Sequence, residues 1–413
     1  MDGKCYGLLG RKLGHSWSVP IHQALGCPDY RLIELEPDAL EAFLRRTDIG
    51  GLNVTIPYKR DVMPYCDEID AAARAIGSVN TIVRRPDGKL CAYNTDAAGF
   101  CYMARRAGIS FAGRKAVILG SGGASLTAQA CARQQGVVIS RSGPDNYENL
   151  SRHADADIVV NTTPVGMYPG NGAAPVDLAA FPACGGVLDV IYNPRRTALL
   201  QQAEALGIPC SDGLPMLVAQ AKAAEEHFFG TAIDDGENER ILAQLRQETE
   251  NIVLIGMPGC GKTTIGKILA DELNKDFTDT DDEIIKRINM PIADYFAKHG
   301  EESFRRIESE VIKEIAACQS SVIATGGGAV LNPDNIRLLK ENGTVIFIDR
   351  PLEKLVTTAD RPLSSNKELL EKRYKERYGL YCAAADVKID AVSRIEQNVK
   401  NIEEVFLNEN TCN

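Results

Sequence analysis

The sequence lacks the marks of several protein classes. None of its 12 cysteines forms a C-x-x-C pair, and its five histidines lie far apart. Close Cys and His spacing is typical of zinc sites and disulfide frameworks, so we expect neither and predict reduced thiols. The chain also lacks an apolar run of membrane length, and its start, MDGKCYGLLG, shows no basic region before a long apolar segment. We therefore expect a cytoplasmic protein with no membrane partner.

Positive charge is also scarce. With 46 Lys and Arg against 56 Asp and Glu, the formal net charge is -10 at pH 7. This balance argues against a general nucleic-acid binder, although local basic pockets for anionic substrates remain open. What the chain does have is length, 413 residues, and a hydrophobic content of 44%. That is enough for two or three cores, so we expect at least two domains.

Short apolar runs alternate with helical patterns along most of the chain. The runs are AVILG, VVIS, DIVVN and VLDVIY, followed later by IVLIG, SVIATGGG and VIFID. Such alternation is typical of parallel α/β sheets, which bind ligands at the carboxyl ends of their strands. The polar segment 231–250 is the best candidate for a domain boundary, and we interpret it as a linker that is part helix. A surface helix within one domain is the alternative.

The stretch IVLIGMPGCGKTTIGKIL, residues 252–269, contains the pattern G-x-x-x-x-G-K-T between an apolar strand and a helix-forming segment. Its glycines let backbone N–H groups converge on a polyphosphate at a helix N-terminus. Lys262 can reach the β- and γ-phosphates, and Thr263 can ligate Mg²⁺. We predict an ATP or GTP site; a glycine turn with a solvated lysine is the alternative. The assigned residues are Gly256, Gly259, Cys260, Gly261, Lys262, Thr263 and Thr264.

Acidic and basic residues downstream suggest a phosphoryl acceptor site. In FTDTDDEII, strand alternation would make Asp279 and Asp281 neighbours at a strand end. Phosphoryl transfer needs one acid near Mg²⁺ and one to orient or deprotonate the accepting hydroxyl. Helix capping by Asp281 or Asp282 is the alternative. Arg305 and Glu308 can share a helix face, where the acid would hold the guanidinium against a substrate carboxylate; a surface salt bridge is the alternative.

In this order, G-x-x-x-x-G-K-T, F-x-D-x-D, G-E-x-x-F-R-x-x-E, G-G-G and R-P-L resemble shikimate kinase, from about residue 251 to about 405. The resemblance implies a nucleoside-monophosphate-kinase-like fold and ATP-dependent phosphorylation of the 3-hydroxyl of shikimate. It implies that Asp281 orients that hydroxyl, that Asp279 lies near Mg²⁺, and that Arg361 is a lid arginine that neutralises the transferring phosphate. The substrate would be held by Arg305, Gly327 and Arg377.

A second glycine turn lies in VILGSGGAS, residues 117–125, between a strand and a helical stretch. In a dinucleotide-binding turn such glycines admit the pyrophosphate to a helix N-terminus; a tight turn without a ligand is the alternative. After the next strand, where an NAD enzyme shows an acid, this chain has Arg141. That residue suits a 2′-phosphate and favours NADP(H), unless it is merely solvated. The assigned residues are Gly120, Ser121, Gly122, Gly123, Ala124, Ser140, Arg141 and Ser142.

Three polar clusters precede this turn: GHSWS, NVTIPYK, and SVNTIV with YNTDAAGF. Their donors and acceptors suit a hydroxylated ring acid. Each also has a simpler alternative, namely strand residues at Asn53 and Thr55, a surface lysine at Lys59 and a helix cap at Asp96. The candidate set is Ser16, Ser18, Asn53, Thr55, Lys59, Asn80 and Asp96.

Together with NTTPVGM, VLDVIYNP and GLPMLVAQAKAAEEHFFG, these clusters resemble shikimate dehydrogenase over about residues 4 to 230. The resemblance implies NADPH-dependent reduction of 3-dehydroshikimate to shikimate, with Lys59 and Asp96 as the catalytic pair. The substrate contacts that it implies are Ser16, Ser18, Asn53, Thr55, Asn80 and Gln220.

The two resemblances share one molecule, because shikimate is the product of the first reaction and the substrate of the second. They imply a bifunctional enzyme of aromatic amino acid biosynthesis. The alternatives are an NAD-dependent enzyme that acts on quinate, or a non-catalytic sensor of pathway intermediates. The expected domains are a catalytic lobe at 1–97 with a return segment at 211–230, a Rossmann NADP domain at 98–210, the linker at 231–250, and a P-loop domain at 251–408.

Overall fold

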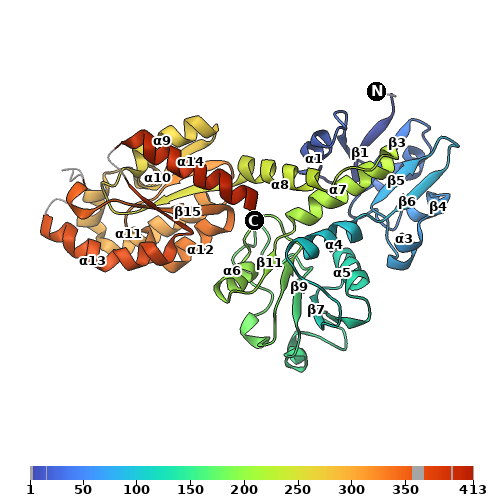
Figure 1. The fold of residues 1–413 in the computed structure, drawn as a ribbon, viewed down its shortest axis with the longest axis horizontal. Coiled ribbons are helices and arrows are strands. Elements are labelled where there is room, and N and C mark those ends of the chain that lie inside the picture. Colours follow the sequence, from blue (N-terminus) through green and yellow to red (C-terminus); the bar gives the residue numbers. More distant parts are fainter. Residues whose placement is uncertain (1–2, 15, 356–366, 392–393, 413) are drawn as a thin grey trace. The chain divides into compact units, whose positions relative to one another are not determined.

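The computed structural model describes residues 3–14, 16–355, 367–391 and 394–412. The chain divides into two compact units, Met1–Leu242 and Ala243–Asn413, and the division falls inside helix α8 (Gly236–Thr249) (Figure 1). Among the residues described, the first unit contains two sheets and the second contains one. In the described ranges no helix is long and apolar enough to cross a membrane. The predicted α/β class with parallel sheets is confirmed.

The first sheet of the N-terminal unit is mixed. Leu9 and Ile82 pack on one of its faces, whereas their neighbours Leu8 and Val83 pack on the other, together with Phe228 of α7 (Leu214–Phe229), as strand alternation requires. The strands are β1 (Cys5–Gly10), β2 (Arg31–Glu34), β3 (Ile49–Val54), β4 (Glu68–Ile69), β5 (Thr81–Arg84) and β6 (Leu90–Tyr93), in the order β2-β1-β3-β5-β6-β4. The accompanying helices are α1 (Ser18–Ala24), α2 (Leu40–Leu44) and α3 (Ala71–Ile76).

The second sheet of this unit is fully parallel. Its strands are β7 (Ala116–Leu119), β8 (Gly136–Ile139), β9 (Ile158–Asn161), β10 (Val187–Asp189) and β11 (Cys210–Ser211), in the order β11-β10-β9-β7-β8. Val117 and Leu119 pack with α6 (Ala198–Ala205), whereas Ile118 packs with α4 (Asp96–Arg106) and α5 (Gly123–Ala132). The strand order reverses beside β7, and ligands bind at such a reversal in parallel sheets. The turn after β7 is the predicted nucleotide turn.

Helices α4 and α7 cross closely and join the two sheets of the N-terminal unit (Figure 1). The boundary expected at residue 97 falls inside α4, and the expected return segment 211–230 contains α7. At Gly99, an added Cβ would lie 2.4 Å from the carbonyl oxygen of Met216 and 3.0 Å from the backbone nitrogen of Gln220. The positions of Asp96 and Gln220 therefore depend on this crossing.

The C-terminal unit has one parallel sheet with helices on both faces. Its strands are β12 (Asn251–Ile255), β13 (Asp276–Asp279), β14 (Ser321–Ala324), β15 (Gly343–Asp349) and β16 (Val387–Asp390), in the order β13-β14-β12-β15-β16. Ile252 and Leu254 pack with α9 (Lys262–Leu273) and α14 (Ile395–Cys412). Val253 and Ile255 face the opposite side, which is covered by α10 (Thr280–Ile288), α11 (Ile292–Ala316), α12 (Pro333–Asn342) and α13 (Lys367–Ala384). Such double burial explains the continuous apolar strands.

The turn that carries the two predicted kinase carboxylates differs from our expectation. Strand alternation was expected to place Asp279 and Asp281 together, but β13 ends at Asp279 and α10 begins at Thr280. The side chain of Asp279 accepts a 3.0 Å hydrogen bond from the backbone N–H of Asp281. The prediction of alternation was wrong because this cap ends the strand, and the capping residue is Asp279 rather than Asp281 or Asp282. This turn links Asp279 to the backbone of Asp281, while the other Asp279 oxygen contacts Thr263.

A buried carboxylate organises the loop after β9. Asp189 accepts hydrogen bonds from Asn161 Nδ2 at 3.0 Å, Thr197 Oγ1 at 2.8 Å and the backbone N–H of Ile191 at 3.0 Å. Burial nevertheless outweighs these donors and raises the pKa of Asp189 to about 6. Asn161 in turn accepts a hydrogen bond from the backbone N–H of Thr163. Asp189 thus fixes Asn161 and, through it, the start of the loop after β9, which lies beside Gly120 in the turn after β7.

We predict that Gly99→Ala destabilises the N-terminal unit by about 1–3 kcal/mol, because the added methyl group meets backbone atoms that cannot rotate away. The only tryptophan of the chain, Trp17, lies in this unit, so urea unfolding followed by tryptophan fluorescence measures the change. Ala98→Ser, on the exposed side of the same turn, is the matched control. An equal loss of stability in both variants would contradict the close crossing.

We predict that Asp189 makes stability depend on pH in a defined direction. Its pKa in the folded state, about 6, exceeds its unfolded value, so between these values the folded state binds more protons than the unfolded chain. The free energy of unfolding, measured relative to Asp189→Asn, should therefore rise by about 2 to 3 kcal/mol as the pH falls from 7 to 4. Urea titrations of both proteins at several pH values test this, and a constant difference would refute it.

Candidate active sites

The N-terminal unit contains a cavity of about 300 Å³ between its mixed sheet and the turn after β7. All eight residues predicted to act on the substrate line this cavity, as does the predicted nucleotide residue Ala124. The lining residues are Leu8, Ser16, Ser18, Asn53, Val54, Thr55, Lys59, Asn80, Asp96, Ala124, Val190, Tyr192, Gly213, Met216, Leu217 and Gln220. The fold thus collects polar clusters that are separated by more than 200 residues in the sequence.

An ion pair faces this cavity. Lys59 Nζ lies 2.5 Å from Asp96 Oδ2, and Asn80 Nδ2 donates a 2.8 Å hydrogen bond to Asp96 Oδ1. Asn80 is itself fixed because its Oδ1 accepts a 2.7 Å hydrogen bond from the backbone N–H of Thr95. Asp96 is the first residue of α4, where the positive end of the helix dipole favours a carboxylate. The ammonium group is thereby held where it can give a proton to a bound oxygen.

A buried network, which the sequence did not indicate, fixes Asn53. Tyr30 donates its hydroxyl proton to Asn53 Oδ1 at 2.7 Å, and the ring of His22 stacks on Tyr30 at 3.8 Å. His22 Nδ1 lies 2.5 Å from Glu225 Oε1, and both side chains are fully buried. Burial lowers the pKa of His22 although Glu225 opposes this shift. His22 lies on α1, Tyr30 lies just before β2 and Glu225 lies on α7, so no spacing in the sequence could reveal this network.

The glycine turn after β7 fits a dinucleotide phosphate. Gly120 has φ +106°, and a Cβ there would lie 2.9 Å from Thr162 Oγ1, so only glycine is accommodated. Gly122 and Gly123 have nothing within 4 Å of an added Cβ, which leaves open space at the N-terminus of α5. Backbone N–H groups at a helix N-terminus attract anions. The exposed residues Ser121, Arg141 and Ser142 and the half-buried Ser140 complete the predicted set.

An apolar wall of the first cavity was missed in the sequence. It consists of Val190, Tyr192, Met216 and Leu217. Val190 and Tyr192 directly follow β10, and the carboxyl ends of parallel strands are where ligands bind. Their position after a predicted strand was the one signal in the sequence that could have identified Val190 and Tyr192.

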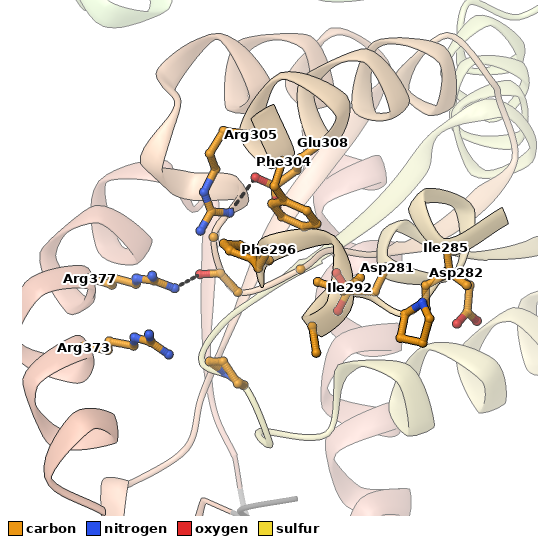
Figure 2. A pocket seen from close by; sticks show the side chains of 16 residues that line it. Asp281, Asp282, Ile285, Ile292, Phe296, Phe304, Arg305, Glu308, Arg373 and Arg377 are labelled. Atoms are coloured by element: carbon orange, nitrogen blue, oxygen red, sulfur yellow. Dashed lines mark hydrogen bonds and ion pairs between the residues drawn. The ribbon is translucent and has the colours of Figure 1, made fainter. Parts of the chain in front are cut away.

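The C-terminal unit contains a larger cavity, of about 490 Å³. Figure 2 shows Arg305, Arg373 and Arg377 directed into it from one side and Asp281 and Asp282 placed on the other. Apolar residues also line it, among them Ile292, Phe296 and Phe304. Of these residues, Asp282, Ile292, Phe296, Phe304 and Arg373 were not predicted to line the site. A cavity with a basic side and an acidic side suits a ligand with an anionic end and a hydroxyl end.

Each glycine of TGGGAV makes room for a neighbour. A Cβ at Gly326 would lie 2.6 Å from Asp281 Oδ1, one at Gly327 would lie 2.8 Å from Pro258 Cδ, and one at Gly328 would lie 2.0 Å from Arg305 Nη1. The carbonyl oxygen of Gly327 accepts hydrogen bonds from Arg377 Nη1 at 2.9 Å and from the hydroxyl of Tyr381 at 2.6 Å. The triple glycine therefore packs the acid, the P-loop and the arginine together.

The predicted pairing of Arg305 with Glu308 is present. Arg305 Nη1 donates to Glu308 Oε2 at 2.7 Å, and Arg305 Nη2 donates to Glu301 Oε1 at 3.0 Å. Glu308 is only 2% exposed, and burial raises its pKa although the guanidinium beside it opposes this. The pair is therefore not an ordinary surface salt bridge. It fixes the guanidinium at the rim of the cavity.

The P-loop has the conformation that its motif requires. Gly256, Gly259 and Gly261 have φ values of +148°, +82° and +105°, which disfavour any residue but glycine. Lys262 begins α9, and its Nζ donates to the carbonyl oxygen of Gly256 at 2.8 Å and to that of Met257 at 3.1 Å. Cys260 is buried against Gly256, and Thr264 is exposed on the first turn of α9.

The two predicted metal ligands are in direct contact. Thr263 Oγ1 donates a 2.7 Å hydrogen bond to Asp279 Oδ2. In the part of the chain that the structure describes, no group of three or more His, Cys, Asp and Glu could hold a metal by itself. A hydroxyl and one carboxylate fit Mg²⁺, which takes few protein ligands and completes its shell with phosphate oxygens and water. The predicted lid arginine, Arg361, lies outside the described residues.

Known proteins resemble the two units separately. The profile of the shikimate dehydrogenase substrate binding domain matches residues 8–82, and that of shikimate kinase matches residues 258–406. Shikimate dehydrogenase (NADP(+)) of Symbiobacterium thermophilum is 36% identical over 264 residues, which cover 55% of this chain and 90% of that one. Shikimate kinase of Clostridium botulinum is 47% identical over 161 residues, which cover 38% of this chain and 97% of that one.

Solved structures resemble the first part of the chain. A chorismate mutase/shikimate 5-dehydrogenase fusion protein from Clostridium acetobutylicum has a TM-score of 0.57 and 34% identity, covering 60% of this chain and 98% of that one. Shikimate 5-dehydrogenase from Thermus thermophilus, solved with NADP(H) and shikimate, has a TM-score of 0.51 and 29% identity, covering 57% and 97%. This chain therefore belongs to two enzyme families at once, to the shikimate dehydrogenase family through its N-terminal part and to the shikimate kinase family through its C-terminal part.

Proposed function

We propose that this chain catalyses two successive reactions, NADPH-dependent reduction of 3-dehydroshikimate to shikimate and ATP-dependent phosphorylation of the 3-hydroxyl of shikimate. One observation carries the proposal: in each unit, an anion-binding glycine turn and a carboxylate line the same cavity. Ala124 and Asp96 do so in the first unit, and Pro258 and Asp281 do so in the second. A carboxylate beside a bound phosphate compound is what proton-coupled hydride or phosphoryl transfer requires.

In the reductase site, bound NADPH supplies the hydride that reduces the C3 ketone. Lys59 donates the proton that the resulting alkoxide takes up, so the ketone becomes an alcohol. Asp96 keeps the Lys59 ammonium in place, and Asn80 keeps Asp96 in place. The apolar wall of Tyr192 and Met216 excludes water from the reacting carbon. The carboxylate and hydroxyls of the substrate are bound by Ser16, Ser18, Asn53, Thr55, Asn80 and Gln220.

In the kinase site, bound ATP with Mg²⁺ supplies the phosphoryl group. Asp281 orients the 3-hydroxyl and accepts its proton as the oxygen bonds to the γ-phosphorus and ADP leaves with the bridging oxygen. Arg305 and Arg377 bind the carboxylate, and the backbone N–H of Gly327 adds a hydrogen bond. Lys262 would bind the phosphates in place of the two loop carbonyls, and Thr263 and Asp279 would hold Mg²⁺. The role of Arg361 as a lid residue stays a prediction from the sequence.

The domain limits follow from the same proposal. Residues 1–97 with 211–230 form the lobe that binds 3-dehydroshikimate, and 98–210 form the NADP domain. Residues 231–250 join them to the P-loop domain at 251–408. Arg141 at the end of β8 supports NADP over NAD, because a guanidinium pairs with the 2′-phosphate.

We predict that each reaction can be removed alone. Lys59→Ala should abolish oxidation of NADPH by 3-dehydroshikimate but leave shikimate-dependent ADP release unchanged, and Asp281→Ala should do the opposite. The reason is that each residue lines only its own cavity. The two rates are measured on one sample by absorbance of NADPH and by a coupled ADP assay. Loss of both reactions in either variant would overturn the model of two independent sites.

We predict that Arg141 sets nucleotide preference. Arg141→Ala should raise the KM for NADPH about 10- to 100-fold, since it removes a charge-assisted contact worth about 1.5–3 kcal/mol, and should leave the KM for NADH unchanged. Arg114→Ala is the matched control, because Arg114 is exposed at the opposite end of β7. Equal changes for both nucleotides would contradict the role assigned to Arg141.

A further inference from the structure

Three arginines line the C-terminal cavity, and only two of them have been given a role. Arg373 and Arg377 lie four residues apart on α13, which places them on the same helix face. Figure 2 shows both side chains directed toward the cavity, with Arg305 approaching from α11. Arg373 therefore belongs to the wall of the site rather than to the outer surface of the helix.

The three guanidinium groups differ in how far their charge is balanced. Arg305 is paired with Glu308 and Glu301, and Arg377 donates to the carbonyl oxygen of Gly327. Within the described ranges, Arg373 makes neither a hydrogen bond nor an ion pair. Most of the positive charge available to an acceptor therefore comes from α13.

On the outer face of α13, in contrast to Arg373, the lysines are paired with glutamates. Lys375 pairs with Glu371 at 2.9 Å and Lys372 pairs with Glu376 at 3.9 Å, both at the i,i+4 spacing. Arg373 and Arg377 have the same spacing but like charges, which destabilises a helix. Burial lowers the pKa of Arg373, and the positive charge of Arg377 adds to this effect, whereas the carboxylates of Glu301 and Glu376 oppose it without reversing it. An anion between the two guanidinium groups would remove both penalties.

The opposite wall determines which end of a ligand this anion belongs to. Asp281 and Asp282 lie across the cavity from the arginines (Figure 2). They would repel an anionic group and accept hydrogen bonds from hydroxyls. A hydroxylated ring acid therefore fits with its carboxylate toward α13 and its hydroxyls toward α10.

We propose that Arg373 is a third carboxylate-binding residue of the kinase site and determines its specificity for anionic acceptors over neutral ring alcohols. This inference rests on the proposed kinase function. Arg305 acts mainly by position, because two glutamates balance its charge. Arg373 and Arg377 together form the cationic pair that receives the carboxylate.

The test compares shikimate with its neutral carboxamide as acceptors for the full-length chain. Arg373→Gln should raise the KM for shikimate about tenfold or more, because one charge-assisted contact is lost, and leave the KM for the carboxamide unchanged. Arg373→Lys, which keeps the charge but not the planar fork, should fall between Arg373→Gln and wild type. Lys372→Gln removes the same charge from the outer face of α13 and should match wild type. An unchanged KM for ATP shows that the variant unit is folded.

Two results would overturn the role of Arg373: an unchanged KM for shikimate in Arg373→Gln, or equal increases for shikimate and its carboxamide. Failure of the kinase proposal itself would look different, because wild type would then phosphorylate neither acceptor. In that case the role of Arg373 is tested by calorimetry, which measures the affinity of wild type and of Arg373→Gln for shikimate and for its carboxamide. Weaker binding of the acid alone supports the proposal, and equal binding by both proteins refutes it.

Discussion

Parallel strands end at the same edge of their sheet, and this constraint places both glycine turns of the chain and several residues beside them. The nucleotide turn follows β7, the apolar wall with Tyr192 follows β10, and the P-loop follows β12. Asp279 ends β13, and the triple glycine follows β14. The reductase and kinase sites therefore use the same part of a parallel sheet, because helix N-termini and strand ends meet at that edge.

Charge within both sites is held in ion pairs whose two partners both line the cavity. Asp96 fixes Lys59 in the first site, and Glu308 fixes Arg305 in the second. Buried or half-buried charges without partners are costly, so pairing lets a reactive group stay in place without unfolding its surroundings. Arg373 departs from this pattern, and a binding site is where such a departure is tolerated.

Glycine serves two purposes in these sites, and the difference lies in the backbone. In the P-loop and at Gly120 it permits positive φ values. In TGGGAV none of the three glycines has a positive φ, and each instead leaves space for a side chain of the site. A sequence pattern alone does not separate these cases, because both appear as glycine after a strand.

The sequence by itself determined the fold class and the two glycine turns, because alternation and turn chemistry are local properties. The order of its motifs led to Lys59, Asp96 and Arg305, which the structure places along the two cavities. Tertiary structure alone decided the network from His22 to Asn53, since its members meet only after folding. It also decided that Asp279 caps a helix and that Arg373 faces the acceptor cavity. Helical spacing shows which residues share a face, but packing determines which face is buried.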